Sequence, residues 1–327
     1  MTHTASLVRI VFLDRDTLPP DIGLRPFAFP SDLREYGATA PEQVAERIAG
    51  TDIVITNKAP VRANAIVGAT NLRLIAIAAT GSDIVDIAAC AKQGVVVSNI
   101  RGYAVNTVPE HTFALILALR RSLVAYRDSV RAGRWGEAGH FCFFDHPIND
   151  LAGATLGIIG DGELGRSVAE IARAFRMRVL FSAYKGVSGM GPLYTPFEDV
   201  LRTSDIITLH APLMPQTRNM IGAQEFAMMT RKPLLINTAR GGLVDEAALA
   251  GALHSGQISG AGFDVGTVEP PPADHPLMRL TELSNFILTP HVAWASREAV
   301  QALADQLVDN VESFCNGLPR NVVAANV

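Results

Sequence analysis

Three side chains with complementary chemistry follow three apolar runs in the second half of the chain. Arg240 stands in a glycine turn after Leu234–Asn237, Glu269 precedes three consecutive prolines, and His291 ends the run Leu288-Thr289-Pro290-His291. A guanidinium can bind a carboxylate and polarise a carbonyl. An imidazole can exchange a proton, and a carboxylate beside it favours its charged form. Because each of these residue types is by itself more often structural or solvated, the prediction rests on their shared placement after strand-like runs.

Together these groups suit the reduction of a 2-keto acid. The reaction needs a cation to hold the carboxylate and polarise the carbonyl, an acid to protonate the developing alkoxide, and a group that tunes this acid. It also needs a hydride donor, so the chain should contain a site for a redox cofactor.

A glycine-rich turn typical of dinucleotide binding occurs at residues 160–165 (GDGELG), after the apolar run Leu156–Ile159. Gly160 permits the tight turn, Gly162 lets a pyrophosphate approach the backbone, and Gly165 lets helix and strand pack closely. The following helix directs free N–H groups at the phosphates. A glycine turn in another kind of α/β protein is the alternative.

The end of the next strand lacks the acid that usually binds the adenosine ribose about 20 residues after the glycines. Arg178–Phe181 continues as Ser182-Ala183-Tyr184-Lys185. A carboxylate there would repel a 2′-phosphate, so Ala183 removes the main barrier to NADP, and Tyr184 and Lys185 could contact that phosphate. A solvated Lys185 with no cofactor role is the alternative. We therefore expect NAD or NADP as cofactor, with NADP tolerated or preferred. Asp161 and Glu163 place carboxylates in the glycine turn, where they can point outward but add no affinity for phosphate.

Strand-like and helix-like runs alternate along the chain, which predicts βαβ units and mostly parallel sheets. The expected strands are 7–13, 52–56, 72–78 and 94–98, then 154–159, 178–181, 205–209, 233–237, 260–263 and 286–288. Helices are expected at 41–49, 61–67, 86–93, 104–132, 162–175, 245–255 and 296–316, with an irregular connector at 134–150. The last helix has no partner in the second half and should return to the first. In parallel sheets, ligands bind at the carboxyl ends of the strands, so Arg240, Glu269 and His291 should face the same edge as the glycine turn.

Composition excludes several classes of protein. The formal net charge is -4, and the densest basic stretch, five arginines between residues 120 and 134, lies on a predicted helix, so we expect no nucleic-acid partner. No apolar run is long enough to span a bilayer, and the first residues resemble a strand rather than a signal peptide. Three widely spaced cysteines without a CxxC pair fit a cytoplasmic protein. No histidines show metal-ligand spacing, so no metal site is expected.

The sequence resembles the D-isomer-specific 2-hydroxyacid dehydrogenase family over essentially its whole length. The matching segments are GDGELG, NTARGGLVDEAA (237–248), GFDVGTVE (262–269) and TPHVAWAS (289–296). The segments FCFFDHPINDLAG (141–153) and TPHVAWAS are most similar to the glycerate dehydrogenase/hydroxypyruvate reductase branch.

The resemblance implies a role for each matching residue. Arg240 would bind the substrate carboxylate and carbonyl, His291 would be the acid in reduction and the base in oxidation, and Glu269 would pair with His291. Asp264 would bind the nicotinamide carboxamide, and backbone N–H groups around Thr80 and Gly81 would bind the substrate carboxylate. The remaining cofactor-binding positions would be Gly160, Gly162, Glu163, Leu164, Gly165, Ala183, Tyr184, Lys185, Ala211, Pro212, Thr217, Thr238 and Ala239.

The resemblance also implies an α/β architecture of two doubly wound parallel-sheet domains with a cleft between them. A flavodoxin-like substrate domain would comprise residues 1–103 and 293–327, and a Rossmann cofactor domain residues 104–292. The expected activity is hydride transfer between NAD(P)H and a small 2-keto acid, hydroxypyruvate or glyoxylate, by a homodimer. Two alternatives stay open: a non-catalytic nicotinamide sensor, and the same scaffold acting on another small anion such as formate or phosphite.

Overall fold

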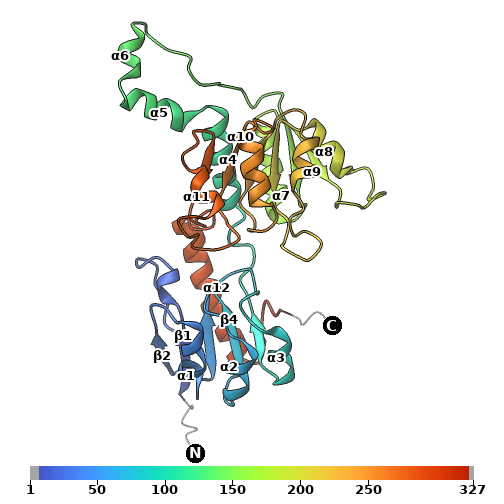
Figure 1. Cartoon of the computed structure of the whole chain (residues 1–327). Coiled ribbons are helices and arrows are strands. Elements are labelled where there is room, and N and C mark those ends of the chain that lie inside the picture. Colours follow the sequence, from blue (N-terminus) through green and yellow to red (C-terminus); the bar gives the residue numbers. More distant parts are fainter. Residues whose placement is uncertain (1–6, 324–327) are drawn as a thin grey trace, which may run out of the picture. The chain divides into compact units, whose positions relative to one another are not determined.

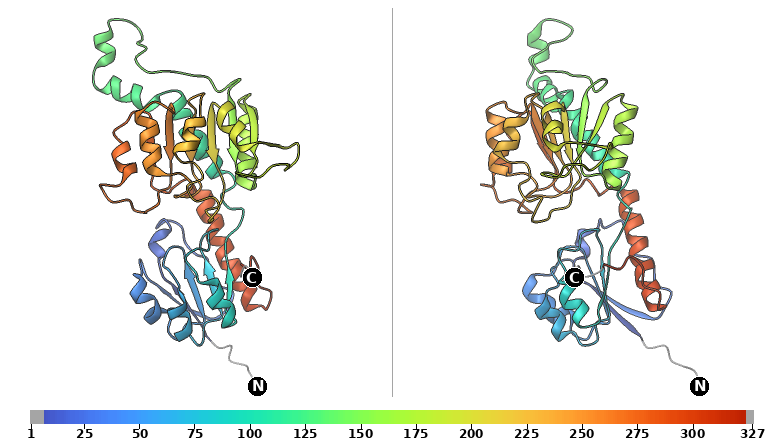
Figure 2. Two further views of the ribbon diagram at one scale, coloured as in Figure 1. Left: turned by 45° about the vertical axis from the view of Figure 1, so that its right-hand side comes forward. Right: turned by 90° about the vertical axis from the view of Figure 1, so that its right-hand side faces the viewer.

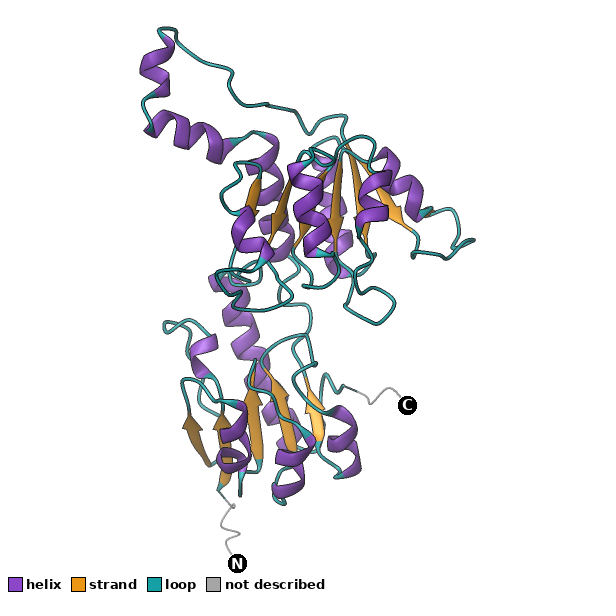
Figure 3. Ribbon diagram, viewed as in Figure 1, coloured by secondary structure: helices purple, strands orange, loops and turns teal. Residues whose placement is uncertain are grey.

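The computed structural model describes residues 7–323 and divides the chain into two compact units. Unit 1 comprises residues 1–103 and 295–327, and unit 2 comprises residues 104–294. Each unit is a parallel β-sheet covered by helices (Figures 1 and 3). The predicted class, two parallel-sheet α/β domains, is confirmed.

Unit 1 contains five parallel strands in the order β2-β1-β3-β4-β5. This is the flavodoxin-like doubly wound order. The strands are β1 (Val8–Phe12), β2 (Ser31–Glu35), β3 (Ile53–Thr56), β4 (Leu74–Ile77) and β5 (Val96–Ser98). The helices are η1 (Arg15–Thr17), η2 (Pro41–Gln43), α1 (Val44–Ile48), α2 (Ala63–Gly68), α3 (Ile87–Lys92) and α12 (Arg297–Cys315). Every residue of β3 and β4 is buried, as expected for central strands covered on both faces.

The C-terminal helix α12 is part of unit 1. Ser296 caps it by accepting a hydrogen bond from the Ala299 N–H, and the helix packs against β4. The buried Asn310 amide donates to the Asn99 carbonyl after β5. Residues 295–323 therefore complete a domain that begins at the other end of the chain.

Unit 2 contains seven parallel strands in the order β12-β11-β10-β9-β6-β7-β8, the Rossmann order with one further strand. The strands are β6 (Thr155–Ile159), β7 (Arg178–Ser182), β8 (Tyr194–Thr195), β9 (Ile206–Leu209), β10 (Leu234–Asn237), β11 (Gly260–Phe263) and β12 (Phe286–Leu288). The helices are α4 (Thr107–Arg120), α5 (Leu123–Arg131), α6 (Arg134–Ala138), α7 (Glu163–Ala174), α8 (Phe197–Thr203), α9 (Ala223–Met228), α10 (Glu246–His254) and α11 (Pro276–Leu280). Helices cover both faces of this sheet (Figure 2).

Two sequence predictions about elements were wrong. The expected single helix over residues 104–132 is two helices, because Ser122 takes a left-handed conformation with φ 48° between α4 and α5. The Ser122 hydroxyl donates to the Pro147 carbonyl, and the Tyr126 hydroxyl donates to the His146 carbonyl, so the returning chain fixes this break. The expected irregular connector begins with α6, and strands β2 and β8 were not predicted.

None of the helices within residues 7–323 combines the length and the apolar character needed to cross a membrane.

Candidate active site

Loops from three neighbouring strands carry the candidate catalytic residues. The sheet places β10, β11 and β12 side by side and parallel, so their carboxyl ends lie at one edge. Arg240 follows β10, Glu269 follows β11 and His291 follows β12. The glycine turn follows β6 at the same edge of the sheet.

The turn that carries Arg240 is held by the side chain of Asn237, the last residue of β10. Asn237 Oδ1 accepts from the Ala239 N–H at 3.1 Å, and its Nδ2 donates to the Arg240 carbonyl at 2.9 Å. The Arg240 guanidinium is partly buried and donates to the Ala239 carbonyl at 2.7 Å. No carboxylate within residues 7–323 forms a salt bridge with Arg240, so most of its donors are available to an anion.

The Arg240 turn packs directly against the turn that carries Glu269. A Cβ atom added to Gly241 would lie 1.9 Å from the Gly266 carbonyl oxygen, so only glycine allows this approach. The Gly266 N–H in turn donates to Glu269 Oε1 at 3.0 Å. Backbone packing between two turns thus brings the candidate anion-binding cation and the candidate carboxylate into one region.

His291 and Glu269 form a hydrogen-bonded pair. His291 Nδ1 lies 2.6 Å from Glu269 Oε2, and the two side chains are 27% and 35% exposed. This contact leaves His291 Nε2 to face a ligand, and the carboxylate holds the ring in one orientation. His291 itself has φ 55°, in the left-handed region, and its carbonyl accepts from Trp294 Nε1 at 2.8 Å.

Asp264 fixes the loop that presents His291. Its carboxylate is 1% exposed and accepts from the Thr289 hydroxyl at 2.5 Å and from the N–H groups of Val292 and Ala293 at 2.9 Å each. These donors flank His291 on both sides. Asp264 is thus a positioning residue for His291, and its expected contact with the nicotinamide carboxamide stays a prediction.

Helix α4 supports the same region, which the sequence did not indicate. His111 Nε2 lies 3.0 Å from the Thr289 hydroxyl and 3.8 Å from Asp264. The Thr112 hydroxyl contacts that of Thr238 at 2.9 Å, both being buried. Nothing in the spacing of residues 107–112 could have found these contacts, because the partners lie more than a hundred positions away in the chain.

The geometry of the glycine turn fits a dinucleotide pyrophosphate. Gly160 has φ 111°, and a Cβ there would meet the His210 carbonyl oxygen at 2.5 Å. A Cβ at Gly165 would meet the Gly160 carbonyl oxygen at 2.1 Å, whereas one at Gly162 would meet nothing within 4 Å. The first and last glycines therefore serve close packing, and Gly162 leaves open space before α7 for phosphate groups.

His210 shapes this turn without exchanging protons. Burial lowers the pKa of the His210 imidazole to about 4, so the ring is neutral at pH 7. Its Nε2 lies 3.0 Å from the Thr208 hydroxyl, and its buried Nδ1 has no hydrogen-bond partner within residues 7–323.

Lys185, in the loop after β7, forms an ion pair within unit 2. Its ammonium lies 2.7 Å from the carboxylate of the buried Glu225 and donates to the Met220 carbonyl at 3.0 Å. Burial alone would raise the pKa of Glu225, but the hydrogen bonds from Lys185 and from the Gly222 N–H lower it. Lys185 is thus paired with Glu225 while its side chain stays 39% exposed, and its contact with a 2′-phosphate stays a prediction. Ala183 is buried and Tyr184 is exposed.

The other predicted contact residues occupy loops that the structure describes. Ala211 and Pro212 follow β9, and the Thr217 hydroxyl donates to the Pro212 carbonyl, so it holds its own loop. Thr80 and Gly81 follow β4 in unit 1, where the Thr80 hydroxyl donates to the Ile100 carbonyl. Their contact with substrate stays a prediction.

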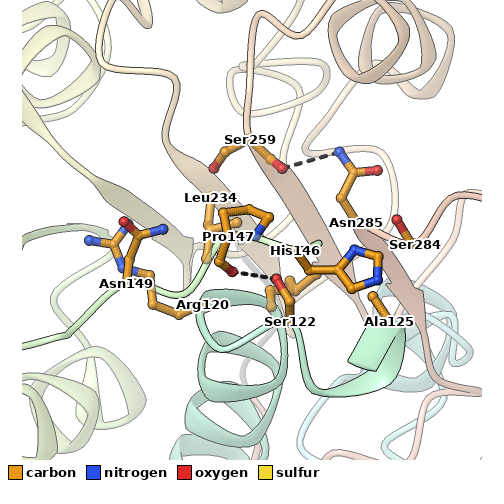
Figure 4. A pocket seen from close by; sticks show the side chains of 11 residues that line it. Arg120, Ser122, Ala125, His146, Pro147, Asn149, Leu234, Ser259, Ser284 and Asn285 are labelled. Carbon is orange, nitrogen blue, oxygen red and sulfur yellow. Dashed lines mark hydrogen bonds between the residues drawn. The ribbon is translucent and has the colours of Figure 1, made fainter. Parts of the chain in front are cut away.

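A cavity of about 90 Å³ lies at the opposite edge of the same sheet, near the amino ends of β10, β11 and β12 (Figure 4). It is lined by residues that include Arg120, His146, Leu234, Ser259 and Asn285. Parallel sheets bind their ligands at the carboxyl edge, so this cavity is separate from the candidate site. Among residues 7–323, no group of three or more His, Cys, Asp or Glu side chains could hold a metal ion.

Comparison with known proteins agrees with this geometry. Residues 113–293 match the family model described as "D-isomer specific 2-hydroxyacid dehydrogenase, NAD binding domain". A glycerate dehydrogenase of Methylorubrum extorquens is 54% identical over 318 residues, covering 97% of this chain and 99% of the relative. A hydroxypyruvate reductase of Blautia hydrogenotrophica is 36% identical, covering 87% and 88%.

Solved structures show the same similarity. A D-lactate dehydrogenase of Aquifex aeolicus complexed with NAD and lactic acid has a TM-score of 0.81 at 26% identity, over 97% of this chain and 100% of that chain. An acyclic imino acid reductase in complex with NADPH and D-Arg has a TM-score of 0.80 at 28% identity, again over 97% and 100%. These neighbours include one complex with NAD and one with NADPH.

Proposed function

Because the chain belongs to the D-isomer-specific 2-hydroxyacid dehydrogenase family, we propose that it interconverts hydroxypyruvate and D-glycerate, or glyoxylate and glycolate. It is an enzyme that uses a nicotinamide dinucleotide. The observation that carries the proposal is the 2.6 Å contact of His291 with Glu269, beside the turn of Arg240 at the carboxyl edge of the sheet. The similarity to a glycerate dehydrogenase and a hydroxypyruvate reductase supports the choice of substrate.

The residues divide the chemistry as follows. The Arg240 guanidinium binds the carboxylate of the keto acid and polarises its carbonyl oxygen. The glycine turn and α7 would hold the dinucleotide, and its reduced nicotinamide would be the source of the hydride. His291 gives the proton on Nε2 to the carbonyl oxygen, so the ketone gains one hydride and one proton. Glu269 stabilises the imidazolium before the transfer, and in the reverse direction His291 takes the proton back.

One panel of assays tests this proposal. Hydroxypyruvate, glyoxylate, pyruvate, formate and phosphite are each combined with NADH or NADPH, or with the oxidised forms for formate and phosphite. We expect the highest kcat/KM with hydroxypyruvate or glyoxylate. Turnover of formate or phosphite alone would contradict the proposed substrate, and binding of NADH without turnover of any acid would favour a nicotinamide sensor.

His291→Asn tests the proton donor. Asparagine tolerates the left-handed backbone at this position, so the change removes the acid with little backbone strain. Loss of a general acid costs about 10²–10⁴-fold in rate. We expect kcat to fall by that amount while NADH binding, measured by fluorescence, persists. Near-normal turnover would refute the role of His291.

For the cofactor, we propose that both NADH and NADPH are accepted. Support comes from Ala183, because β7 itself ends without the carboxylate that usually repels a 2′-phosphate. The salt bridge of Lys185 with Glu225 argues against a large preference for NADPH, because that ammonium is already paired. The ratio of kcat/KM for the two cofactors measures this, and an NADH preference above about a hundredfold, worth about 2.7 kcal/mol, would contradict it.

We propose that the chain forms a homodimer through α5, α6 and the loop that follows them. This arm extends from the body of unit 2 (Figures 1 and 2) and exposes Trp135, Phe141 and Phe144, at 52%, 89% and 83% of their surfaces. Exposed apolar clusters of this kind mark protein interfaces. Sedimentation velocity should give a dimer for the wild-type chain and a monomer for the double variant Phe141→Ser, Phe144→Ser; a wild-type monomer would contradict the proposal.

We also propose a cytoplasmic location. All three cysteines, Cys90, Cys142 and Cys315, are free thiols, as expected in a reducing compartment. Fractionation of cells that express the tagged chain would test this.

A further inference from the structure

Asp161 stands between the first two glycines of the turn, and its carboxylate has a definite partner. The Tyr194 hydroxyl donates to Asp161 Oδ2 at 2.5 Å, and Asp161 is partly buried. The sequence did not indicate this partner for the carboxylate. A carboxylate held in this way keeps one position relative to the strand ends.

The position of this contact follows from the order of the strands. β7 lies between β6, which leads into Asp161, and β8, which carries Tyr194. Tyr194 pairs with Phe181 of β7, and the Ala183 N–H donates to the Thr195 carbonyl at 2.7 Å. Neighbouring strands are about 4.8 Å apart, so a tyrosine that reaches from β8 to the turn after β6 must cross the carboxyl end of β7.

The charges around this contact agree with that position. The pKa of Tyr194 is raised, first by its hydrogen bond to Asp161, with a smaller contribution from Tyr184 and an opposing one from Arg166. Tyr184 directly follows Ala183, so the contact lies close to the end of β7. Arg166 Nε donates to the Asp161 backbone carbonyl at 2.8 Å, and the guanidinium also acts on the Tyr194 hydroxyl, so a positive charge lies in the same region as the carboxylate.

We propose that Asp161, held by Tyr194, is the acid that discriminates against a 2′-phosphate in this enzyme, in place of an acid at position 183. In Rossmann domains the end of the second strand is where a carboxylate accepts a hydrogen bond from the adenosine ribose 2′-OH. Here β7 is that strand, and its own end offers only Ala183. The carboxylate reaches the same place from the glycine turn. This inference rests on the proposed use of a nicotinamide dinucleotide.

The sign of the effect follows from charge. Asp161 can accept a hydrogen bond from a ribose 2′-OH, whereas a 2′-phosphate carries about two negative charges and is repelled. Arg166 offsets part of this repulsion, so NADPH is still accepted. We expect the wild-type chain to favour a 2′-OH over a 2′-phosphate by about tenfold, which is worth about 1.4 kcal/mol. Asp161→Asn removes the repulsion and leaves the Arg166 charge uncompensated, so the preference should disappear or reverse.

Titration calorimetry with two nucleotides tests this without turnover. Adenosine 5′-monophosphate and adenosine 2′,5′-bisphosphate differ only in the 2′-phosphate, and each is titrated into the full chain. The ratio of their Kd values should change by at least about tenfold in Asp161→Asn. Tyr194→Phe, which frees the carboxylate but keeps its charge, should give an intermediate ratio. The ratio of kcat/KM for NADPH and NADH should shift in the same direction.

Glu170→Gln is the matched control. Glu170 is exposed on α7, two turns after the end of the helix that lies next to Asp161. The variant therefore loses the same charge as Asp161→Asn, at a position away from the proposed site. Its Kd ratio should equal that of the wild-type chain. An unchanged ratio in a folded Asp161→Asn variant, or an equal change in Glu170→Gln, would overturn the inference. Failure of the wild-type chain to bind either nucleotide, or NADH, would instead contradict the proposed function.

Discussion

Replacing Gly241 by alanine should separate the two turns that carry Arg240 and Glu269. The new Cβ would lie 1.9 Å from the Gly266 carbonyl oxygen and 2.7 Å from the Thr267 nitrogen. Nonbonded Cβ contacts below 3.0 Å do not occur, so the turns must part by about 1 Å. Both partners are backbone atoms, so no side-chain rotation can relieve the contact.

A displacement of about 1 Å in an active site can cost on the order of a hundredfold in rate. We therefore expect kcat/KM for hydroxypyruvate to fall about a hundredfold in Gly241→Ala, a loss of about 2.7 kcal/mol of transition-state stabilisation. Overpacking should also cost about 1–3 kcal/mol of stability. NADH binding should change little, because the glycine turn at Gly160 is a separate element.

Steady-state kinetics with NADH, NADH fluorescence titration and urea unfolding measure these three quantities. Gly251→Ala in α10 is the control, since its Cβ would meet nothing within 4 Å. Alanine there should stabilise the helix by about 0.5–1 kcal/mol and leave the kinetics unchanged. A folded Gly241→Ala variant with kcat/KM within about threefold of wild type would refute the reasoning that this backbone contact places the site.

Three further changes have defined outcomes. Arg240→Ala should raise KM for the keto acid and lower kcat, because the guanidinium both binds and polarises the substrate; unchanged values would place the anion anchor elsewhere. Asp264→Asn places an amide N–H₂ group against the buried N–H groups of Val292 and Ala293. The free energy of unfolding in urea should therefore fall by about 1–3 kcal/mol, and kcat should fall as well. An unchanged free energy of unfolding would contradict the role of Asp264. Burial lowers the folded-state pKa of His210 from the ordinary histidine value of 6.5 to about 4, so the unfolded chain binds more protons between these pH values and stability falls as pH decreases. Between about pH 7 and about pH 5, the free energy of unfolding of the wild-type chain should fall by up to about 2 kcal/mol more than that of the His210→Gln variant. The same pH dependence in both proteins would contradict this prediction.

The sequence was informative where apolar runs are continuous and glycines are grouped. The buried strands β3, β4, β6 and β10 were predicted for that reason, and so was the turn at Gly160. Strand β2 (SDLRE) was missed because it is polar, partly exposed and at the edge of its sheet. Strand β8 has two residues, too few to form a pattern.

Contacts between distant positions account for what was missed at the site. The sequence did not indicate the ion pair of Lys185, because its partner Glu225 lies 40 positions away, on α9. The role of Tyr194 toward Asp161 likewise depends on strand order, which local patterns do not contain. The break at Ser122 depends on a hydrogen bond to the returning chain at Pro147.

The left-handed backbone at His291 limits which residues can replace it during evolution. Glycine, asparagine, aspartate and histidine enter this region at low cost, and β-branched residues do so at high cost. Of these four, histidine is the one whose two ring nitrogens can bind Glu269 on one side and exchange a proton with a ligand on the other. Asparagine or glycine at this position would keep the backbone conformation and remove the proposed proton donor. The backbone thus restricts this position to a few residue types, and the proposed chemistry selects histidine among them.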